Sequence, residues 1–117
     1  MKLNHIDLPV TDLEGAAGYF QRGFGFERMP APAGGMAILR GEDDFALILQ
    51  QVETAEYPKA FHIGFLQPSD AAVHAAYQRL ADAGLPLPAA PAVSYGCLGF
   101  WCQAPGGILV EVSHRPG

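Results

Sequence analysis

Two histidines and one glutamate stand where they could bind a divalent metal ion together. His5 lies in the N-terminal segment 4–8, and His62 lies in the similar segment 61–65. Glu111 interrupts the apolar run 108–112, where burying a carboxylate costs several kcal/mol unless it is paired or bound to a cation. Neutral imidazole is a common metal ligand, and two imidazoles with one carboxylate leave coordination positions open for a substrate. These residue types predict a metal site made of His5, His62 and Glu111.

The segments around the two histidines belong to a repeat that covers the whole chain. Each His-Ile pair is followed by residues that favour a helix start, at 11–12 and at 69–70, because their side-chain oxygens accept from free backbone N–H groups. Thr11 and Glu14 also match a capping box. Apolar residues then recur at helical spacing: Leu13, Ala16, Ala17 and Phe20 in the first half, and Val73, Ala76, Tyr77 and Leu80 in the second. Glycines 25 and 84 predict the helix ends.

Three strand-like segments follow each predicted helix. They are 26–29, 36–39 and 45–51 in the first half, and 87–89, 98–103 and 108–114 in the second. The chain is therefore expected to be one α+β domain, residues 1–117, with two βαβββ modules that form a half-open curved sheet. Module 1 covers 1–52, a polar linker covers 53–60, and module 2 covers 61–117.

Strand alternation predicts which side chains share a face. Because successive side chains point to opposite faces, His5, His62 and Glu111 should all lie opposite the apolar, helix-covered faces, on the concave side. Asp7 shares the face of His5 and could act as a base, orient a ligand, or simply be solvated at the edge of the cleft. Tyr95 and Trp101 could line the pocket or belong to the core.

The remaining bulk features exclude other classes of function. A net charge of −5 and seven scattered basic residues argue against a nucleic-acid groove. No apolar run approaches the roughly 18 residues of a membrane span, and the N-terminus lacks a signal peptide, so we expect a cytoplasmic protein. Cys97 and Cys102 should be reduced thiols on opposite faces of one strand. His74 is expected on the surface of the second helix. His114 is expected on the helix-facing side of the last strand, away from the site.

These residues together resemble the vicinal oxygen chelate superfamily, which includes glyoxalase I, extradiol dioxygenases, fosfomycin resistance proteins and bleomycin resistance proteins. The resemblance rests on the motifs at 4–6, 10–12, 61–63 and 107–112, and it covers essentially the whole chain. It implies that His5, His62 and Glu111 surround one divalent ion, either Mn, Fe, Zn or Ni. It also implies a homodimer in which a site takes His5 from one chain and His62 with Glu111 from the other.

The sequence departs from the family pattern at the last strand of module 1. Aligning the two modules places Ile48 opposite Glu111, where four-ligand glyoxalases carry an acidic residue or Gln. Gln50 or Gln51 could replace that ligand only if the register shifted. The chain also lacks the dense set of cations that would bind a phosphonate.

Two hypotheses for function follow from the resemblance. The first is a metal-dependent lyase, isomerase or dioxygenase that chelates two adjacent oxygens of a small polar metabolite. The second is a metal-free protein that binds or sequesters a small molecule, in the manner of bleomycin resistance proteins. The presence of all three ligand types favours the first.

Overall fold

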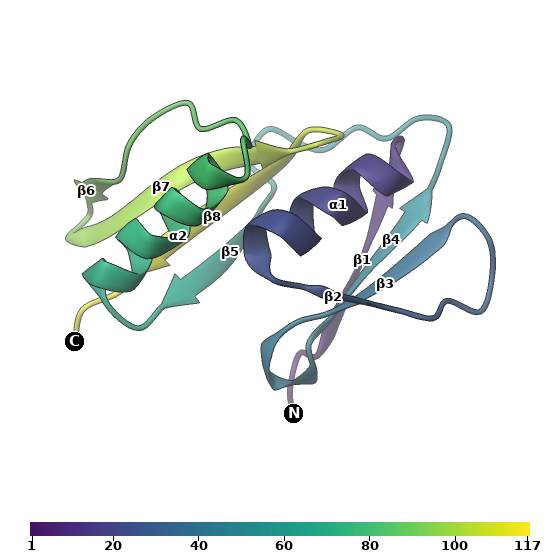
Figure 1. Ribbon diagram of the computed structural model, residues 1–117, viewed down its shortest axis with the longest axis horizontal. Coiled ribbons are helices and arrows are strands. Elements are labelled where there is room, and N and C mark those ends of the chain that lie inside the picture. The colour runs from purple at the N-terminus through teal and green to yellow at the C-terminus, as the bar shows by residue number, and fades with distance from the viewer. The chain divides into compact units, whose positions relative to one another are not determined.

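A computed structural model describes all 117 residues as two compact units, Met1–Glu56 and Tyr57–Gly117. Each unit has the same order of elements, in which a strand and a helix precede three further strands (Figure 1). Unit 1 contains β1 (His5–Val10), α1 (Leu13–Phe24), β2 (Glu27–Met29), β3 (Met36–Arg40), the short 3-10 helix η1 (Glu42–Asp44) and β4 (Ala46–Gln51). Unit 2 contains β5 (His62–Gln67), α2 (Asp70–Asp82), β6 (Ala92–Ser94), β7 (Cys97–Ala104) and β8 (Ile108–His114).

The strands of each unit form one open four-stranded sheet with the same topology. The strand order is β1-β4-β3-β2 in unit 1 and β5-β8-β7-β6 in unit 2. In each sheet the first and last strands of the unit run parallel, and the other neighbours are antiparallel. The expected α+β class with two βαβββ modules is confirmed.

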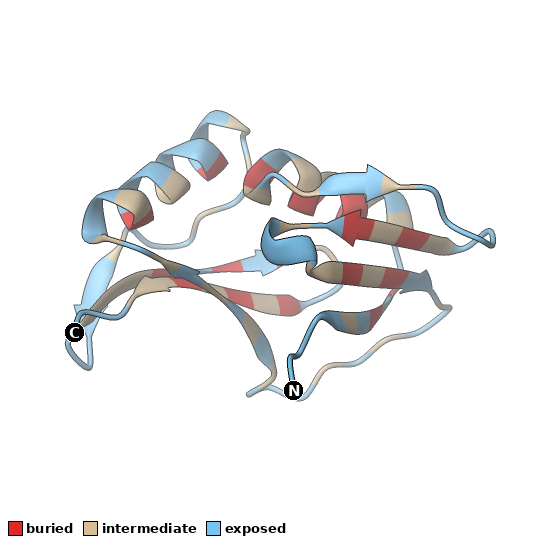
Figure 2. Ribbon diagram, turned by 90° about the horizontal axis from the view of Figure 1, so that it is seen from below, coloured by how far each residue is buried: buried red, intermediate tan, exposed pale blue.

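The core of each unit lies between its helix and one face of its sheet. Buried and more exposed residues alternate along the central strands (Figure 2). In unit 1, Leu8, Val10, Leu47 and Leu49 are at most 2% exposed, as is Phe20 on α1. In unit 2, Val110, Val112 and Phe100 are buried to the same extent, and the Phe100 ring contacts that of Tyr77 on α2, with centroids 5.3 Å apart. Burial of these apolar surfaces fixes the strand faces, because a register slip of one residue would expose them.

Helix α1 begins one residue later than the capping-box pattern predicts. Asp12, not Thr11, is the N-cap, and its side chain accepts from the backbone N–H of Gly15. Glu14 instead forms a two-pronged ion pair with Arg28, at 2.7 and 2.9 Å, and this hydrogen bonding lowers the pKa of the Glu14 carboxyl. The Thr11 capping box is therefore wrong: the helix begins one residue later, with Asp12 as its N-cap, and the Glu14 carboxylate binds the Arg28 guanidinium instead. At the other end, Gly25 adopts φ 73, as a left-handed cap requires.

The first strand after α2 also differs from the prediction. The structure places β6 at Ala92–Ser94, not at 87–89. Residues 85–91 contain three prolines, which cannot donate ladder hydrogen bonds. Tyr95 and Gly96 both have positive φ, 51 and 76, which suits a two-residue hairpin turn that pairs β6 with the start of β7.

Two further expectations concern the thiols and the helices. Neither Cys97 nor Cys102 forms a disulfide; Cys102 is buried on the helix side, whereas Cys97 is only half-buried. Neither helix has the length and apolar character that a membrane crossing requires.

Candidate functional site

Three of the predicted site residues gather on the open face of the unit 2 sheet. Glu111 on β8 lies directly opposite Gly64 on β5 and opposite Trp101 on β7. His62 lies on the same face of β5, two residues before Gly64. The His62 and Trp101 rings meet edge to face, with centroids 5.0 Å apart. Because β8 separates their strands, which are then about 10 Å apart, both rings must lean across β8 beside Glu111.

The His62 ring is oriented by a backbone carbonyl two residues earlier in the chain. Its Nδ1 lies 3.0 Å from the carbonyl oxygen of Ala60, an atom that only accepts, so this nitrogen carries the proton. Nε2 is then the unprotonated nitrogen that can bind a cation. A carbonyl acceptor behind a histidine is a common means of fixing the tautomer of a metal ligand.

The surroundings of Glu111 leave its carboxylate without a protein partner. It is half-buried within an apolar strand, and no hydrogen bond or ion pair within its unit satisfies it. Its Oε1 lies 3.7 Å from where a side chain at Gly64 would begin, so the bare glycine leaves room for it. His62 and Glu111 are diagonal neighbours on adjacent strands. The backbones of such residues are about 7–8 Å apart, so the two side chains can reach a common ion.

Unit 1 presents His5 and Asp7 on the open face of its sheet, both exposed. The Nδ1 of His5 lies 2.7 Å from Oδ1 of Asn4, so the tautomer is again fixed with Nε2 available. The carboxylate of Asp7 accepts from Nε2 of Gln50 at both oxygens, at 2.9 and 2.8 Å. Residues at i and i+2 of a strand are about 7 Å apart, so both side chains can approach one point.

The register of unit 1 confirms that Ile48 occupies the position equivalent to Glu111. Asp7 pairs with Ile48, as Gly64 pairs with Glu111. Gln51 cannot replace the missing ligand, because its amide caps α1: Oε1 accepts from the Leu13 N–H, and Nε2 donates to the carbonyls of Thr11 and Val52.

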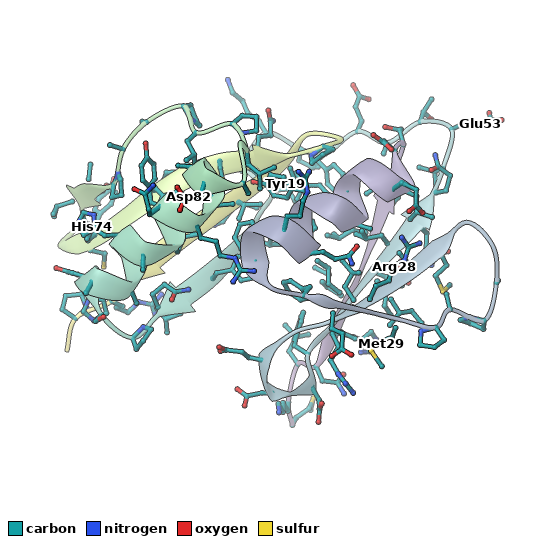
Figure 3. All side chains as sticks on the ribbon, in the orientation of Figure 1. Tyr19, Arg28, Met29, Glu53, His74 and Asp82 are labelled. Carbon is teal, nitrogen blue, oxygen red and sulfur yellow. The ribbon has the colours of Figure 1, made fainter.

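Of the other residues considered from sequence, Trp101 lies beside His62 and the rest lie elsewhere. Tyr95 is fully exposed in the β6–β7 turn, whereas Trp101, 41% exposed, contacts His62. His74 projects from the exposed side of α2 (Figure 3). His114 lies 2.8 Å from Asp70 at the start of α2, on the helix side as expected.

The open face of each unit carries donor types that suit a divalent ion. Within either unit, no three His, Cys, Asp or Glu side chains come close enough to share an ion. Unit 2 carries an imidazole and a carboxylate without a partner on its open face, and unit 1 carries an imidazole with a fixed tautomer on its own open face. Imidazole and carboxylate donors suit Mn, Fe, Ni or Zn rather than a soft ion such as Cu(I). The contacts of Asn4, Ala60 and Gln50 were not predicted, because strand alternation says nothing about residues before a strand or about diagonal side-chain bonds.

Comparison with solved structures finds the same fold in several bacterial proteins. A possible glyoxalase from Bacillus cereus is 32% identical, with a TM-score of 0.82 over 96% of this chain and 97% of that chain. A lactoylglutathione lyase from Agrobacterium tumefaciens has a TM-score of 0.77 at 18% identity over 97% and 92% of the two chains. A glyoxalase-related enzyme from Fulvimarina pelagi has a TM-score of 0.79 at 21% identity over 98% and 88%.

Comparison with curated proteins finds no match. A family model, in contrast, matches nearly the entire sequence, residues 2–112. The duplicated βαβββ units, the matched length and the shared fold agree, and the chain belongs to the Glyoxalase/Bleomycin resistance protein/Dioxygenase superfamily.

Proposed function

We propose that the protein is a metal-dependent enzyme, a lyase, isomerase or dioxygenase, in which His5, His62 and Glu111 bind one divalent ion. The observation that carries the proposal is the His62–Glu111 pair, an imidazole with Nε2 free beside a half-buried carboxylate that has no partner. A bound ion would act as a Lewis acid on two adjacent oxygens of a small substrate. In this reading, the contacts of Ala60 and Asn4 hold the two imidazoles in the ligating tautomer.

The charges on the open faces limit the substrate class. The open-face positions of β5, β8 and β7 carry no lysine or arginine; they are His62, Gly64, Leu66, Leu109, Glu111, Ser113, Cys97, Gly99, Trp101 and Gln103. On the open face of unit 1, the guanidinium of Arg40 is paired with the carboxylate of Glu27, with Nη2 3.5 Å from Oε2. A substrate with several negative charges would find few partners, so we infer a small polar metabolite of low charge. The exposed indole of Trp101 offers an apolar contact for it.

The proposal is tested by titrating chelator-treated protein with Mn²⁺ or Co²⁺ while following tryptophan fluorescence. Trp101 is the only tryptophan and touches His62, so a paramagnetic ion at this site should quench its emission. We expect saturable quenching at one ion per chain, with matching metal content by elemental analysis. Emission that remains unchanged while the protein takes up no metal would refute the enzyme proposal.

A metal-free binding protein is the alternative, and it is favoured by the exposed Trp101 and the bare position Gly64 on either side of Glu111. Aromatic side chains next to open space are common in small-molecule pockets. The same titration separates the two functions, because this alternative predicts no metal uptake.

We further propose a homodimer whose sites combine His5 of one chain with His62 and Glu111 of the other. Mixing His5→Ala and His62→Ala chains by refolding then produces heterodimers with one intact site and one doubly damaged site. We expect the mixture to regain about a quarter of the wild-type metal, whereas each variant alone binds almost none. No recovery, or a monomer by light scattering, would contradict the shared site. A cytoplasmic location likewise stays a prediction from the sequence.

A further inference from the structure

The two units differ in where they carry a carboxylate next to their histidine. In unit 2, the residue two positions after His62 on β5 is Gly64, and it pairs with Glu111 on β8. In unit 1, the residue two positions after His5 on β1 is Asp7, and it pairs with Ile48 on β4. Each pair therefore contains one carboxylate. In unit 1 the carboxylate is on the first strand, β1, and in unit 2 it is on the last strand, β8.

Asp7 is held in place by a single partner from the neighbouring strand. Gln50 lies opposite Pro9, and its side chain reaches back along the strand, so that Nε2 donates to both carboxylate oxygens of Asp7. No arginine, lysine or histidine pairs with Asp7. Each oxygen accepts one hydrogen bond and keeps a further lone pair for another partner. The negative charge on this open face is thus fixed in position but not neutralised by a cation of the protein.

We infer that Asp7 is the fourth protein donor of the metal site and that Gln50 is its positioning residue. The inference rests on the proposed function. Ile48 cannot ligate, and the amide of Gln51 is committed to the start of α1. Gln50 lies opposite Pro9, farther along the strand from His5 than Asp7 does, which leaves Asp7 as the nearest donor beside His5. A strand places i and i+2 side chains on one face, so His5 and Asp7 can bind one ion as His62 and Glu111 do. Each unit then contributes one imidazole and one carboxylate.

This assignment is tested by Mn²⁺ binding to Asp7→Asn, which keeps the shape of the side chain and removes its charge. We expect its Mn²⁺ affinity to fall at least tenfold, with the unfolding midpoint of the metal-free protein unchanged. Gln50→Ala should lower the affinity by less than Asp7→Asn does, since it removes only the hydrogen bond that positions the carboxylate. The matched control is the Gln78–Asp82 pair on α2, which has the same 2.8 Å amide-to-carboxylate bond (Figure 3 labels Asp82). Asp82→Asn and Gln78→Ala should leave Mn²⁺ affinity at the wild-type value.

A spectroscopic readout distinguishes a donor from a merely structural residue. With Co²⁺, Asp7→Cys should give a thiolate-to-cobalt charge-transfer band that the wild type, with Cys97 and Cys102 alone, lacks. Wild-type Mn²⁺ affinity in Asp7→Asn, with metal lost in His62→Ala, would overturn this inference and leave the proposed function intact. Failure of the wild type to bind any of these ions would overturn both.

Discussion

His62→Ala and Glu111→Gln should each weaken divalent metal binding at least a hundredfold, which corresponds to about 3 kcal/mol of binding free energy. His62→Ala removes a proposed ligand whose tautomer is fixed by the Ala60 carbonyl. Glu111→Gln keeps the side-chain shape and removes the charge that attracts the cation. Calorimetric titration with Mn²⁺, Co²⁺ and Zn²⁺ measures the loss.

The controls for these variants are surface residues of the same types. His74→Ala on α2 and Glu53→Gln after β4 alter exposed side chains that take no part in the proposed site (both are labelled in Figure 3). Both controls should bind metal with wild-type affinity. Glu111→Gln should also stabilise the metal-free fold slightly or leave it unchanged, because a half-buried carboxylate without a partner is unfavourable. Undiminished metal binding in both site variants would remove His62 and Glu111 from the site.

Phe20→Ala should lower the free energy of unfolding by about 3–5 kcal/mol. Phe20 is 0% exposed, and its ring contacts those of Tyr19, Phe24 and Phe26, with centroids 5.3, 5.7 and 6.0 Å away. Truncation leaves a cavity between α1 and its sheet, which a close-packed core cannot fill. Urea denaturation followed by circular dichroism measures the change.

The matched control for this variant is Leu3→Ala, because Leu3 is apolar but 81% exposed. We expect its free energy of unfolding to change by less than about 0.5 kcal/mol. A loss of under about 1 kcal/mol in Phe20→Ala would contradict the assignment of this ring cluster as the core of unit 1. The size of the expected loss matters because small domains are stable by only about 5–15 kcal/mol.

The fold could be predicted from the sequence wherever periodicity carried the information. The paired His-Ile segments and two helical stripes revealed the duplication, and alternation in β8 separated Val110 and Val112 from Glu111. The prediction failed where one local signal had to outweigh another. Leu87 and its flanking prolines predicted a weak strand. Instead, the Tyr95–Gly96 turn pairs the residues just before it, β6 at Ala92–Ser94, with the start of β7.

The candidate site was predictable in its residue types but not in its supporting contacts. Strand alternation placed His5, His62 and Glu111 on open faces, and the module alignment placed Ile48 opposite Glu111, as the register shows. The bond from Gln50 to Asp7 was not predictable, because it joins residues far apart in sequence and depends on a diagonal reach between strands. The carbonyl of Ala60 behind His62 was missed for a similar reason: it lies outside β5, where no alternation rule applies.

The most direct test of the metal centre is a crystal structure of the protein loaded with Mn²⁺ or Zn²⁺, with anomalous scattering recorded at the metal edge. We predict one anomalous peak per site, about 2.0–2.3 Å from Nε2 of His5, Nε2 of His62 and a carboxylate oxygen of Glu111. A peak bound by other residues, or no peak near these three side chains in protein that holds stoichiometric metal, would contradict the account.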